Sequence, residues 1–378
     1  MLNIVADQNI PLAGELFRPF GNVTLVDGRG LAAAQIREAD VLLVRSVTRV
    51  DECLLSESKV QFVGSATSGY DHLDLAYLQR CKIPYALASG ANAESVVEYV
   101  LAAMCSQPSF LEKLFTGGKL GVVGYGHVGR RLAEVATCLG MDVGVYDPFV
   151  DCGSYTNDLQ QVLDSDVISL HCELTDHGRF PSKHLLNKSR LETLGDRQLL
   201  INAARGGVID NAALLDRLQQ PNAPVVVLDC WENEPSIHQQ LVPMVSIATP
   251  HIAGYSYDSK IRGSVMLRDA LAKHLACQTI DVSFDNDLCL NLDNTLSLAL
   301  SLANLVTNIY RVDADDARFR RALAEADSES GGRWFDDLRR NYPTRRELLG
   351  AKVSVDARTD SLERLAQCFK LQLIDRSS

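Results

Sequence analysis

Three residues in the second half of the chain have side chains that suit one oxidation reaction: Arg205 in NAARGGVID, Glu234 in DCWENEP and His251 in TPHIAG. An imidazole takes up a hydroxyl proton near neutral pH, and a neighbouring carboxylate stabilises the imidazolium that forms. A guanidinium grips a carboxylate through two parallel hydrogen bonds. Taken singly, each residue fits a surface ion pair or a packed histidine. Together they predict proton abstraction from a 2-hydroxy acid, with the hydride passing to a nicotinamide.

A binding site for that nicotinamide cofactor is predicted by the segment from Leu120 to Asp147, which contains GYGHVG. A strand pattern precedes the glycines, a helical pattern follows them, and a second strand pattern ends at Asp147. A glycine-rich turn alone would fit any βα unit, but the complete pattern favours a dinucleotide site whose pyrophosphate lies at the helix N-terminus. The predicted cofactor contacts in this segment are Gly124, Gly126, His127, Val128, Gly129 and Asp147. Because a carboxylate at Asp147 would bind a ribose diol and repel a 2′-phosphate, we expect NAD rather than NADP.

Parallel strands must position these residues, and the chain has the pattern for them. Short apolar strand patterns alternate with helical patterns along most of the sequence. This alternation predicts an α/β fold with two Rossmann-like or flavodoxin-like lobes, in which chemistry lies at the carboxyl ends of parallel strands. We predict a substrate-binding domain of residues 1–92 with 256–284, a NAD-binding Rossmann domain of residues 93–255, and a smaller C-terminal α+β domain of residues 285–378.

Two strand ends in the first predicted domain carry charged or small polar side chains. Arg45 and Ser46 follow the third predicted strand, and Ser65 to Gly69 follow the fourth. A loop of small residues offers backbone amides to an oxyanion, although a plain Ser/Gly loop is about as good a reading of this local sequence. The guanidinium of Arg45 and the hydroxyl of Ser46 could bind a phosphate group.

The charge balance and the cysteine positions exclude several classes of protein. The chain has 48 Asp and Glu against 37 Lys and Arg, a net charge of −11, which argues against nucleic acid as a partner. Neither a signal sequence nor an apolar run of about 18 residues is present, so we expect a cytoplasmic protein without a membrane span. The ten cysteines are scattered and have no metal-ligand spacing. We therefore expect no metal, and cysteines that are mostly buried and reduced.

The motifs GYGHVG, NAARGGVID, DCWENEP and TPHIAG resemble those of the D-isomer-specific 2-hydroxyacid dehydrogenase family. The resemblance implies that Arg205, Glu234 and His251 are the catalytic residues. It also implies further cofactor contacts, which are Thr175, Ala203, Asp229 and Gly254. Formate dehydrogenases of this superfamily lack the glutamate, so Glu234 argues against that branch.

Two further stretches, SATSGYDH from Ser65 and WFDDLRRNYPTRRE from Trp334, resemble one branch of this family. That branch oxidises a phosphorylated four-carbon 2-hydroxy acid in pyridoxal phosphate biosynthesis and carries a C-terminal dimerisation domain. The resemblance implies a homodimer, and it makes Ser46, Thr67 and Tyr255 substrate contacts. Two alternatives stay open: the same chemistry on another acid such as 3-phosphoglycerate, and a NAD-sensing binding protein that resembles the C-terminal-binding corepressors.

Overall fold

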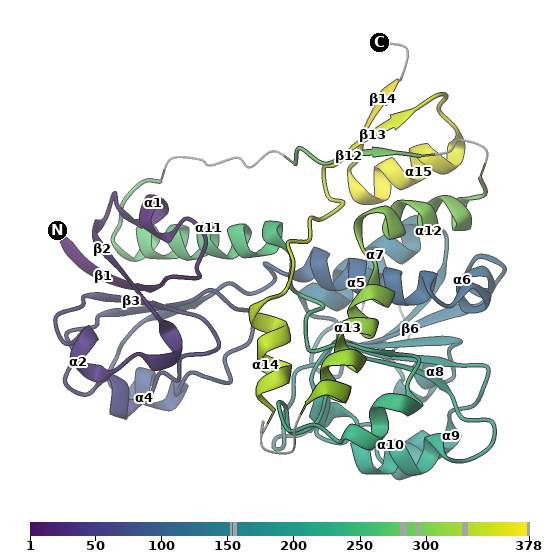
Figure 1. The fold of residues 1–378 in the computed structure, drawn as a ribbon, viewed down its shortest axis with the longest axis horizontal. Helices are drawn as coiled ribbons and strands as arrows, with labels where there is room; N and C mark the ends of the chain where they lie inside the picture. The colour runs from purple at the N-terminus through teal and green to yellow at the C-terminus, as the bar shows by residue number, and fades with distance from the viewer. Residues whose placement is uncertain (152, 154–156, 280–285, 293–295, 327–331, 376–378) are drawn as a thin grey trace. The chain divides into compact units, whose positions relative to one another are not determined.

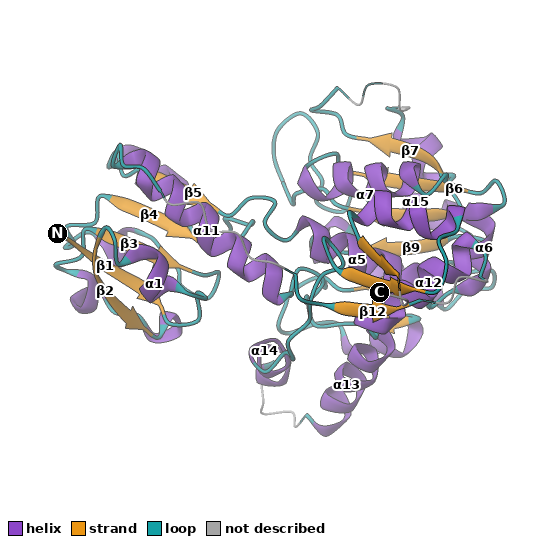
Figure 2. Ribbon diagram, turned by 90° about the horizontal axis from the view of Figure 1, so that it is seen from above, coloured by secondary structure: helices purple, strands orange, loops and turns teal. Residues whose placement is uncertain are grey.

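The computed structural model describes residues 1–378 except 152, 154–156, 280–285, 293–295, 327–331 and 376–378. It divides into two compact units, one of residues 1–92 with 256–284 and one of residues 93–255 with 285–378. Each contains a parallel sheet with helices on its faces (Figures 1 and 2). None of the helices in the described ranges has the length and apolar character needed to cross a membrane.

The first unit is built on a five-stranded parallel sheet in the order β2-β1-β3-β4-β5. Its strands are β1 (Leu2–Asp7), β2 (Gly21–Val26), β3 (Val41–Val44), β4 (Phe62–Ser65) and β5 (Tyr85–Leu87). Its helices are α1 (Ala13–Phe17), η1 (Gly28–Gly30), α2 (Ala33–Ile36), α3 (Glu52–Leu55), α4 (Leu75–Arg80) and α11 (Tyr257–His274).

Alternating side chains of this sheet build two separate cores. Val41 and Leu43 of β3 pack with α1 and α11, whereas Leu42 and Val44 pack with α2, α3 and α4 on the other face. All four side chains are buried, as expected for a strand covered on both faces. The helix α11 therefore completes this unit, which is the physical reason that a segment after residue 255 returns to it.

The second unit contains a six-stranded parallel sheet in the order β11-β10-β9-β8-β6-β7. Its strands are β6 (Lys119–Val123), β7 (Asp142–Tyr146), β8 (Val167–Leu170), β9 (Leu199–Asn202), β10 (Val225–Leu228) and β11 (Ile247–Ala248). Its helices are α5 (Ala93–Cys105), α6 (Pro108–Phe115), α7 (His127–Cys138), α8 (Leu159–Leu163), α9 (Lys188–Thr193), η2 (Gly206–Val208), α10 (Asn211–Leu218) and η3 (Gln239–Met244). The strand order reverses at β6, between β7 and β8, which is where open α/β sheets bind their ligands.

The C-terminal segment of the second unit adds a three-stranded parallel sheet in the order β12-β13-β14. Its elements are β12 (Cys289–Asn291), α12 (Leu298–Ile309), α13 (Val312–Glu325), α14 (Arg333–Arg340), β13 (Lys352–Val355), α15 (Asp360–Phe369) and β14 (Gln372–Asp375). Helix α12 packs against α5, and α15 packs against α7 (Figure 1). One continuous apolar core joins Leu132 and Val135 of α7 to Leu365 and Phe369 of α15.

The predicted alternation of strands and helices is present in both units. The cysteine prediction was wrong about burial, and it did not include a disulfide. Cys138 at the end of α7 and Cys368 on α15 form a disulfide, with 5.7 Å between their Cα atoms. Among the described free cysteines, those at positions 53, 81, 277 and 289 are exposed. A disulfide across 230 residues has no local signature in the sequence, because it depends on two helices that meet only after folding.

Candidate active site

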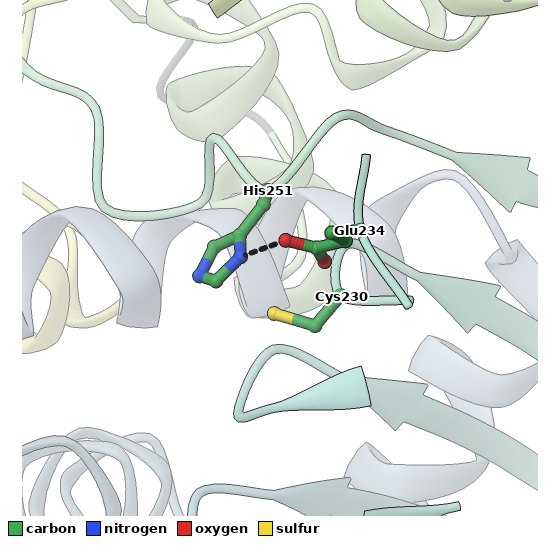
Figure 3. A group of neighbouring side chains, drawn as sticks. All are labelled: Cys230, Glu234 and His251. Atoms are coloured by element: carbon green, nitrogen blue, oxygen red, sulfur yellow. Dashed lines mark hydrogen bonds and ion pairs between the residues drawn. The ribbon is translucent and has the colours of Figure 1, made fainter. Parts of the chain in front are cut away.

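The imidazole of His251 and the carboxylate of Glu234 form a hydrogen-bonded pair (Figure 3). The distance from His251 Nδ1 to Glu234 Oε2 is 2.8 Å, and the other carboxylate oxygen of Glu234 accepts a 2.7 Å hydrogen bond from the Trp231 amide. Burial alone would raise the pKa of Glu234, but His251, the Trp231 amide and a nearby arginine lower that pKa below its ordinary value. Because the ionised carboxylate accepts a hydrogen from Nδ1, the lone pair of the neutral ring lies on Nε2.

Backbone geometry fixes the place of the His251 side chain. The residue has φ of 56°, a left-handed conformation that is uncommon for a residue with a side chain and that typically occurs at functional sites. Its amide donates to the Asp229 carbonyl at 2.7 Å. The buried Asp229 carboxylate accepts from the amides of Ile252 and Ala253 and from the Thr249 hydroxyl. Asp229 therefore anchors the loop that presents the histidine.

Arg205 lies in the same cavity as this pair. The cavity has a volume of about 280 Å³, and its lining includes Arg205, Glu234 and His251 together with Lys183 and Trp231. Arg205 follows strand β9 in extended conformation, and its Nη1 donates to the Ala204 carbonyl at 2.9 Å. The structure thus brings the three predicted catalytic residues together from loops after three different strands. A base, its orienting carboxylate and a cation beside one cavity can hold and deprotonate a hydroxy acid.

Cys230 lies beside the pair, with its sulfur, the Glu234 carboxylate and the His251 ring close enough to share a metal ion (Figure 3). Burial is the main cause that raises the pKa of the Cys230 thiol, and the charges of Asp229 and Glu234 raise it further. The thiol also lies 3.3 Å from the Ala204 carbonyl, to which it donates. Because metals bind the thiolate, this environment does not favour a metal site. The expected absence of a metal stays a prediction.

The glycine turn has the geometry that a dinucleotide requires. Gly124 has φ of 96°, and a Cβ atom there would lie 2.6 Å from the Cys172 amide at the end of β8. At Gly129 a Cβ atom would lie 1.9 Å from the Gly124 carbonyl, so helix α7 approaches the turn closely. A Cβ atom at Gly126 would meet nothing within 4 Å, and His127 begins the helix directly after it. Space beside the amides of His127 and Val128 is what a pyrophosphate needs.

Asp147 follows β7 and is tied to this turn. Its Oδ2 accepts a 2.8 Å hydrogen bond from the Tyr125 amide, and its Oδ1 accepts one from the Phe149 amide. The carboxylate therefore lies beside the glycines, where the adenosine ribose of a dinucleotide binds in this fold. The residues present fit NAD, and the contact of Asp147 with the ribose stays a prediction.

The remaining predicted cofactor contacts also lie at the carboxyl ends of the strands. Thr175 is held in the loop after β8 by Ser182, whose Oγ accepts from the Thr175 amide at 2.8 Å. Ala203 directly follows β9, and Gly254 lies in the His251 loop. Asp229 was predicted to face the cofactor. In the structure both of its carboxylate oxygens accept hydrogen bonds from the loop that carries His251. The cofactor roles of these residues stay predictions.

The predicted substrate contacts of the first unit gather at the ends of neighbouring strands β3 and β4. Arg45 Nε donates to the buried carboxylate of Asp7 at 3.0 Å, and Ser46 is exposed. Thr67 Oγ1 donates to the Gly69 carbonyl at 3.1 Å and lies 2.9 Å from Ser65 Oγ. Tyr255 belongs to the other unit, where its ring packs edge to face on Tyr342 at 5.9 Å. The substrate roles of Arg45, Ser46, Thr67 and Tyr255 stay predictions.

His171 is excluded as an alternative general base by its surroundings. Burial lowers the pKa of His171 to about 3, and its Nε2 lies 2.8 Å from the Ser169 hydroxyl. An imidazole with such a pKa is too weak a base to match a reaction near neutral pH.

Some residues that shape the site were missed from the sequence. Trp231 contributes its amide to Glu234, and its indole Nε1 donates to the Thr249 carbonyl at 2.8 Å. The hydroxyl groups of Tyr99 and Thr249 are hydrogen-bonded at 2.8 Å, so helix α5 supports the His251 loop. Trp231 and Thr249 belong to the motifs DCWENEP and TPHIAG, which could have drawn attention to them. Tyr99 and Lys183 stand in no such motif.

Comparisons with known proteins agree with this geometry. The family described as the NAD binding domain of D-isomer specific 2-hydroxyacid dehydrogenases matches residues 86–253. A family described only as a domain of unknown function matches residues 289–368. The fold and the site thus define a NAD-binding dehydrogenase of the 2-hydroxyacid class.

Curated relatives extend over nearly the whole chain. The erythronate-4-phosphate dehydrogenase of Cellvibrio japonicus is 42% identical, over 95% of this chain and 97% of its own length. The protein of that name from Azotobacter vinelandii is 40% identical, over 97% of this chain and 99% of its own length. The chain therefore belongs to the erythronate-4-phosphate dehydrogenase family.

Solved structures share the fold of the two α/β sheets. The D-lactate dehydrogenase of Aquifex aeolicus, solved with NAD and lactic acid, has a TM-score of 0.59 at 24% identity and covers 72% of this chain and 95% of its own. The 3-phosphoglycerate dehydrogenase of Entamoeba histolytica, solved with NAD⁺, has a TM-score of 0.60 at 22% identity and covers 73% and 95%. The predictions of the family, the α/β fold class, the dehydrogenase activity and NAD as cofactor are confirmed.

Proposed function

We propose that this chain oxidises 4-phospho-D-erythronate with NAD⁺ to 2-oxo-3-hydroxy-4-phosphobutanoate, in pyridoxal 5′-phosphate biosynthesis. The observation that carries the chemistry is the convergence of Arg205, Glu234 and His251 on one cavity. The name shared by relatives over nearly the full chain supports the substrate. The same comparison makes 3-phosphoglycerate and a NAD-sensing binding protein less favoured alternatives.

Each residue of the trio has a separate task in the proposed reaction. His251 Nε2 takes the proton of the C2 hydroxyl, and Glu234 stabilises the imidazolium through Nδ1. Arg205 binds the substrate carboxylate and places positive charge near the developing carbonyl oxygen. Bound NAD⁺ supplies the acceptor for the C2 hydride. We further propose that Arg45 and Ser46 bind the phosphate, that Thr67 and Tyr255 contact the substrate, and that the enzyme works in the cytoplasm.

Steady-state NADH formation with several 2-hydroxy acids tests this function. We expect the highest kcat/KM for 4-phospho-D-erythronate, with 3-phosphoglycerate and D-lactate well below it. The variant Arg205→Met should lose about 10- to 100-fold in kcat/KM, because a charge-assisted carboxylate contact is lost. If kcat/KM were higher with 3-phosphoglycerate, that acid would be assigned as the substrate instead. NAD binding without turnover of any acid would favour the binding-protein alternative.

We also propose that residues 285–378, which share an apolar core with helices α5 and α7, make a homodimer. Two large apolar side chains support this: Leu300 on α12 is 58% exposed, and Ile374 on the edge strand β14 is 39% exposed. Sedimentation velocity of Leu300→Glu should show monomer at concentrations where the unchanged protein is a dimer. Leu25→Glu is a matched control, because Leu25 is 51% exposed on β2 of the other unit. A dimer that survives Leu300→Glu together with Ile374→Glu would contradict the proposal.

A further inference from the structure

Helix α14 of the C-terminal segment packs directly on the loop that carries Glu234. Its Trp334 and Phe335 join an aromatic cluster in which the rings of Phe319 and Trp231 stack at 5.5 Å. Gly332, just before the helix, is so close to this loop that a Cβ atom there would lie 2.9 Å from the Pro235 carbonyl oxygen. The DCWENEP loop is thus held on both sides of Glu234, at Trp231 and at Pro235, by residues from the C-terminal segment.

Arg339 is the residue of α14 whose charge acts on the catalytic pair. Its guanidinium lies 5.8 Å from the ring centroid of Tyr255, and it donates a hydrogen bond to the Tyr255 side chain. The side chain is 23% exposed and lies 3.7 Å from Asp336. Its Nε is buried without a hydrogen-bond partner in the part of the chain that the structure describes. The charge of Arg339 acts on Glu234, where it is one of the causes that lower the pKa of that carboxyl.

The neighbouring arginine shows that this arrangement is not a general property of the helix. Arg340 Nη1 lies 3.2 Å from Asp337, and both side chains are more than half exposed. Such a pair contributes little to stability. Arg339 has a comparable contact with Asp336 on the same helix, at 3.7 Å. Unlike Arg340, it also lies against Tyr255, four residues after the catalytic histidine.

Other charged and titratable groups also surround the pair. They are Asp229 and Cys230 after β10, Arg205, Lys183 and Glu232 around the cavity, and Tyr255, Asp336 and Arg339 on the side of α14. Arg205 and Lys183 are the other cations of this set, and both line the cavity. Arg339 differs from them because it is not among the residues that line the cavity, and its guanidinium lies against the Tyr255 ring.

We propose that Arg339 is a positioning residue of the dehydrogenase, which holds the Tyr255 hydroxyl and places a fixed positive charge beside the Glu234–His251 pair. The charge favours the ionised carboxylate and the neutral imidazole, the form in which His251 can accept the substrate proton. The role of Tyr255 toward substrate rests on the proposed function, whereas the effect on the pair does not require a substrate.

NMR titration of the His251 imidazole in the substrate-free protein measures the charge effect. Loss of a nearby positive charge makes the pair easier to protonate, so its titration midpoint should rise by about 0.5 to 1 pH unit in Arg339→Gln. Arg339→Lys should restore the midpoint, and Arg340→Gln on the same helix should leave it unchanged. An unchanged midpoint in folded Arg339→Gln, or an equal rise in Arg340→Gln, would overturn the proposal.

Kinetics measure the contact with Tyr255. The acid limb of kcat/KM for oxidation should move to higher pH in Arg339→Gln by the same amount as the midpoint, and Arg339→Lys should rescue it. Arg339→Met and Tyr255→Phe each break the hydrogen bond, so their losses in kcat/KM should be less than additive in the double variant. Fully additive losses would remove the Tyr255 contact from the proposal. Absence of turnover in the unchanged protein would instead refute the proposed function, while the NMR midpoint would still decide the role of the charge.

Discussion

The Glu98 carboxylate on helix α5 accepts a 2.5 Å hydrogen bond from the amide of Leu348, which lies 250 residues later in the C-terminal segment. Glu98 is fully buried, and its other carboxylate oxygen has no hydrogen-bond partner among the described residues. Burial, and next the charge of Glu347, raise the pKa of Glu98 well above its ordinary value. We therefore expect the contact between helix α5 and the C-terminal segment to depend on pH.

Replacement of Glu98 by Gln should stabilise the protein at neutral and alkaline pH. A raised pKa means that the folded state binds the proton more tightly, so the unchanged protein loses stability as the pH rises above the ordinary carboxyl range. The amide side chain of Glu98→Gln keeps an acceptor for the Leu348 amide and carries no charge. Thermal unfolding between about pH 5 and pH 8 should show the advantage of Glu98→Gln growing with pH. Glu112→Gln, at an exposed position on α6, is the control. A difference that does not vary with pH would contradict this account.

The replacement of His251 by Ala should lower kcat by about 10²- to 10⁴-fold, because the proton acceptor is removed. Binding of NAD should be largely kept, since the glycine turn is not touched. Glu234→Gln should have a smaller effect in the same direction, because the imidazole is kept but the imidazolium is less stabilised. Steady-state kinetics together with NAD titration by fluorescence measure both effects. His238→Ala, at an exposed position, is the matched control, and near-normal turnover in His251→Ala would remove His251 from the mechanism.

Asp147 should decide the choice between NAD and NADP. Asp147→Ala removes the charge that repels a 2′-phosphate and the acceptor for the Tyr125 amide. We expect the KM for NAD to rise by about tenfold and the preference for NAD over NADP to shrink, because both the ribose contact and the turn are weakened. Kinetics with the two cofactors measure the ratio. Asp142→Ala, on the exposed start of β7, should leave it unchanged. A clear preference of the unchanged protein for NADP would rule out this role.

The Cys138–Cys368 disulfide should stabilise the second unit. It closes a loop of 230 residues between α7 and α15, and a native disulfide typically contributes about 2–4 kcal/mol by restricting the unfolded chain. Without reductant, Cys138→Ser should therefore unfold at lower denaturant concentration than the unchanged protein, and reductant should abolish the difference. Cys53→Ser removes an exposed free thiol and should have little effect. Reactive thiols can be counted in the denatured wild-type protein with and without prior reduction. Equal counts would show that the disulfide does not form.

The sequence by itself determined the elements and most of the predicted active site. Strands such as Val167–Leu170 are short apolar runs, and Arg205, Glu234 and His251 each follow a predicted strand. Parallel strands place their carboxyl ends at one edge, so residues distant in the chain could be expected to converge without knowledge of the side-chain packing. The turn at Gly124 was also predictable, because the sequence has a glycine there. The structure agrees with this, since the residue has positive φ and close neighbours, which favour glycine.

Only the tertiary structure decided how residues 285–378 attach to this scaffold. The stacking of Trp231 on Phe319, the hydrogen bond from Arg339 to Tyr255 and the disulfide of Cys138 with Cys368 join distant parts of the chain. Helical periodicity in α14 predicts a buried face but does not identify the surface that covers it. The partners of charged, thiol and aromatic side chains are determined only when the helices pack. These contacts depend on distances of a few ångströms between elements that lie far apart in the sequence.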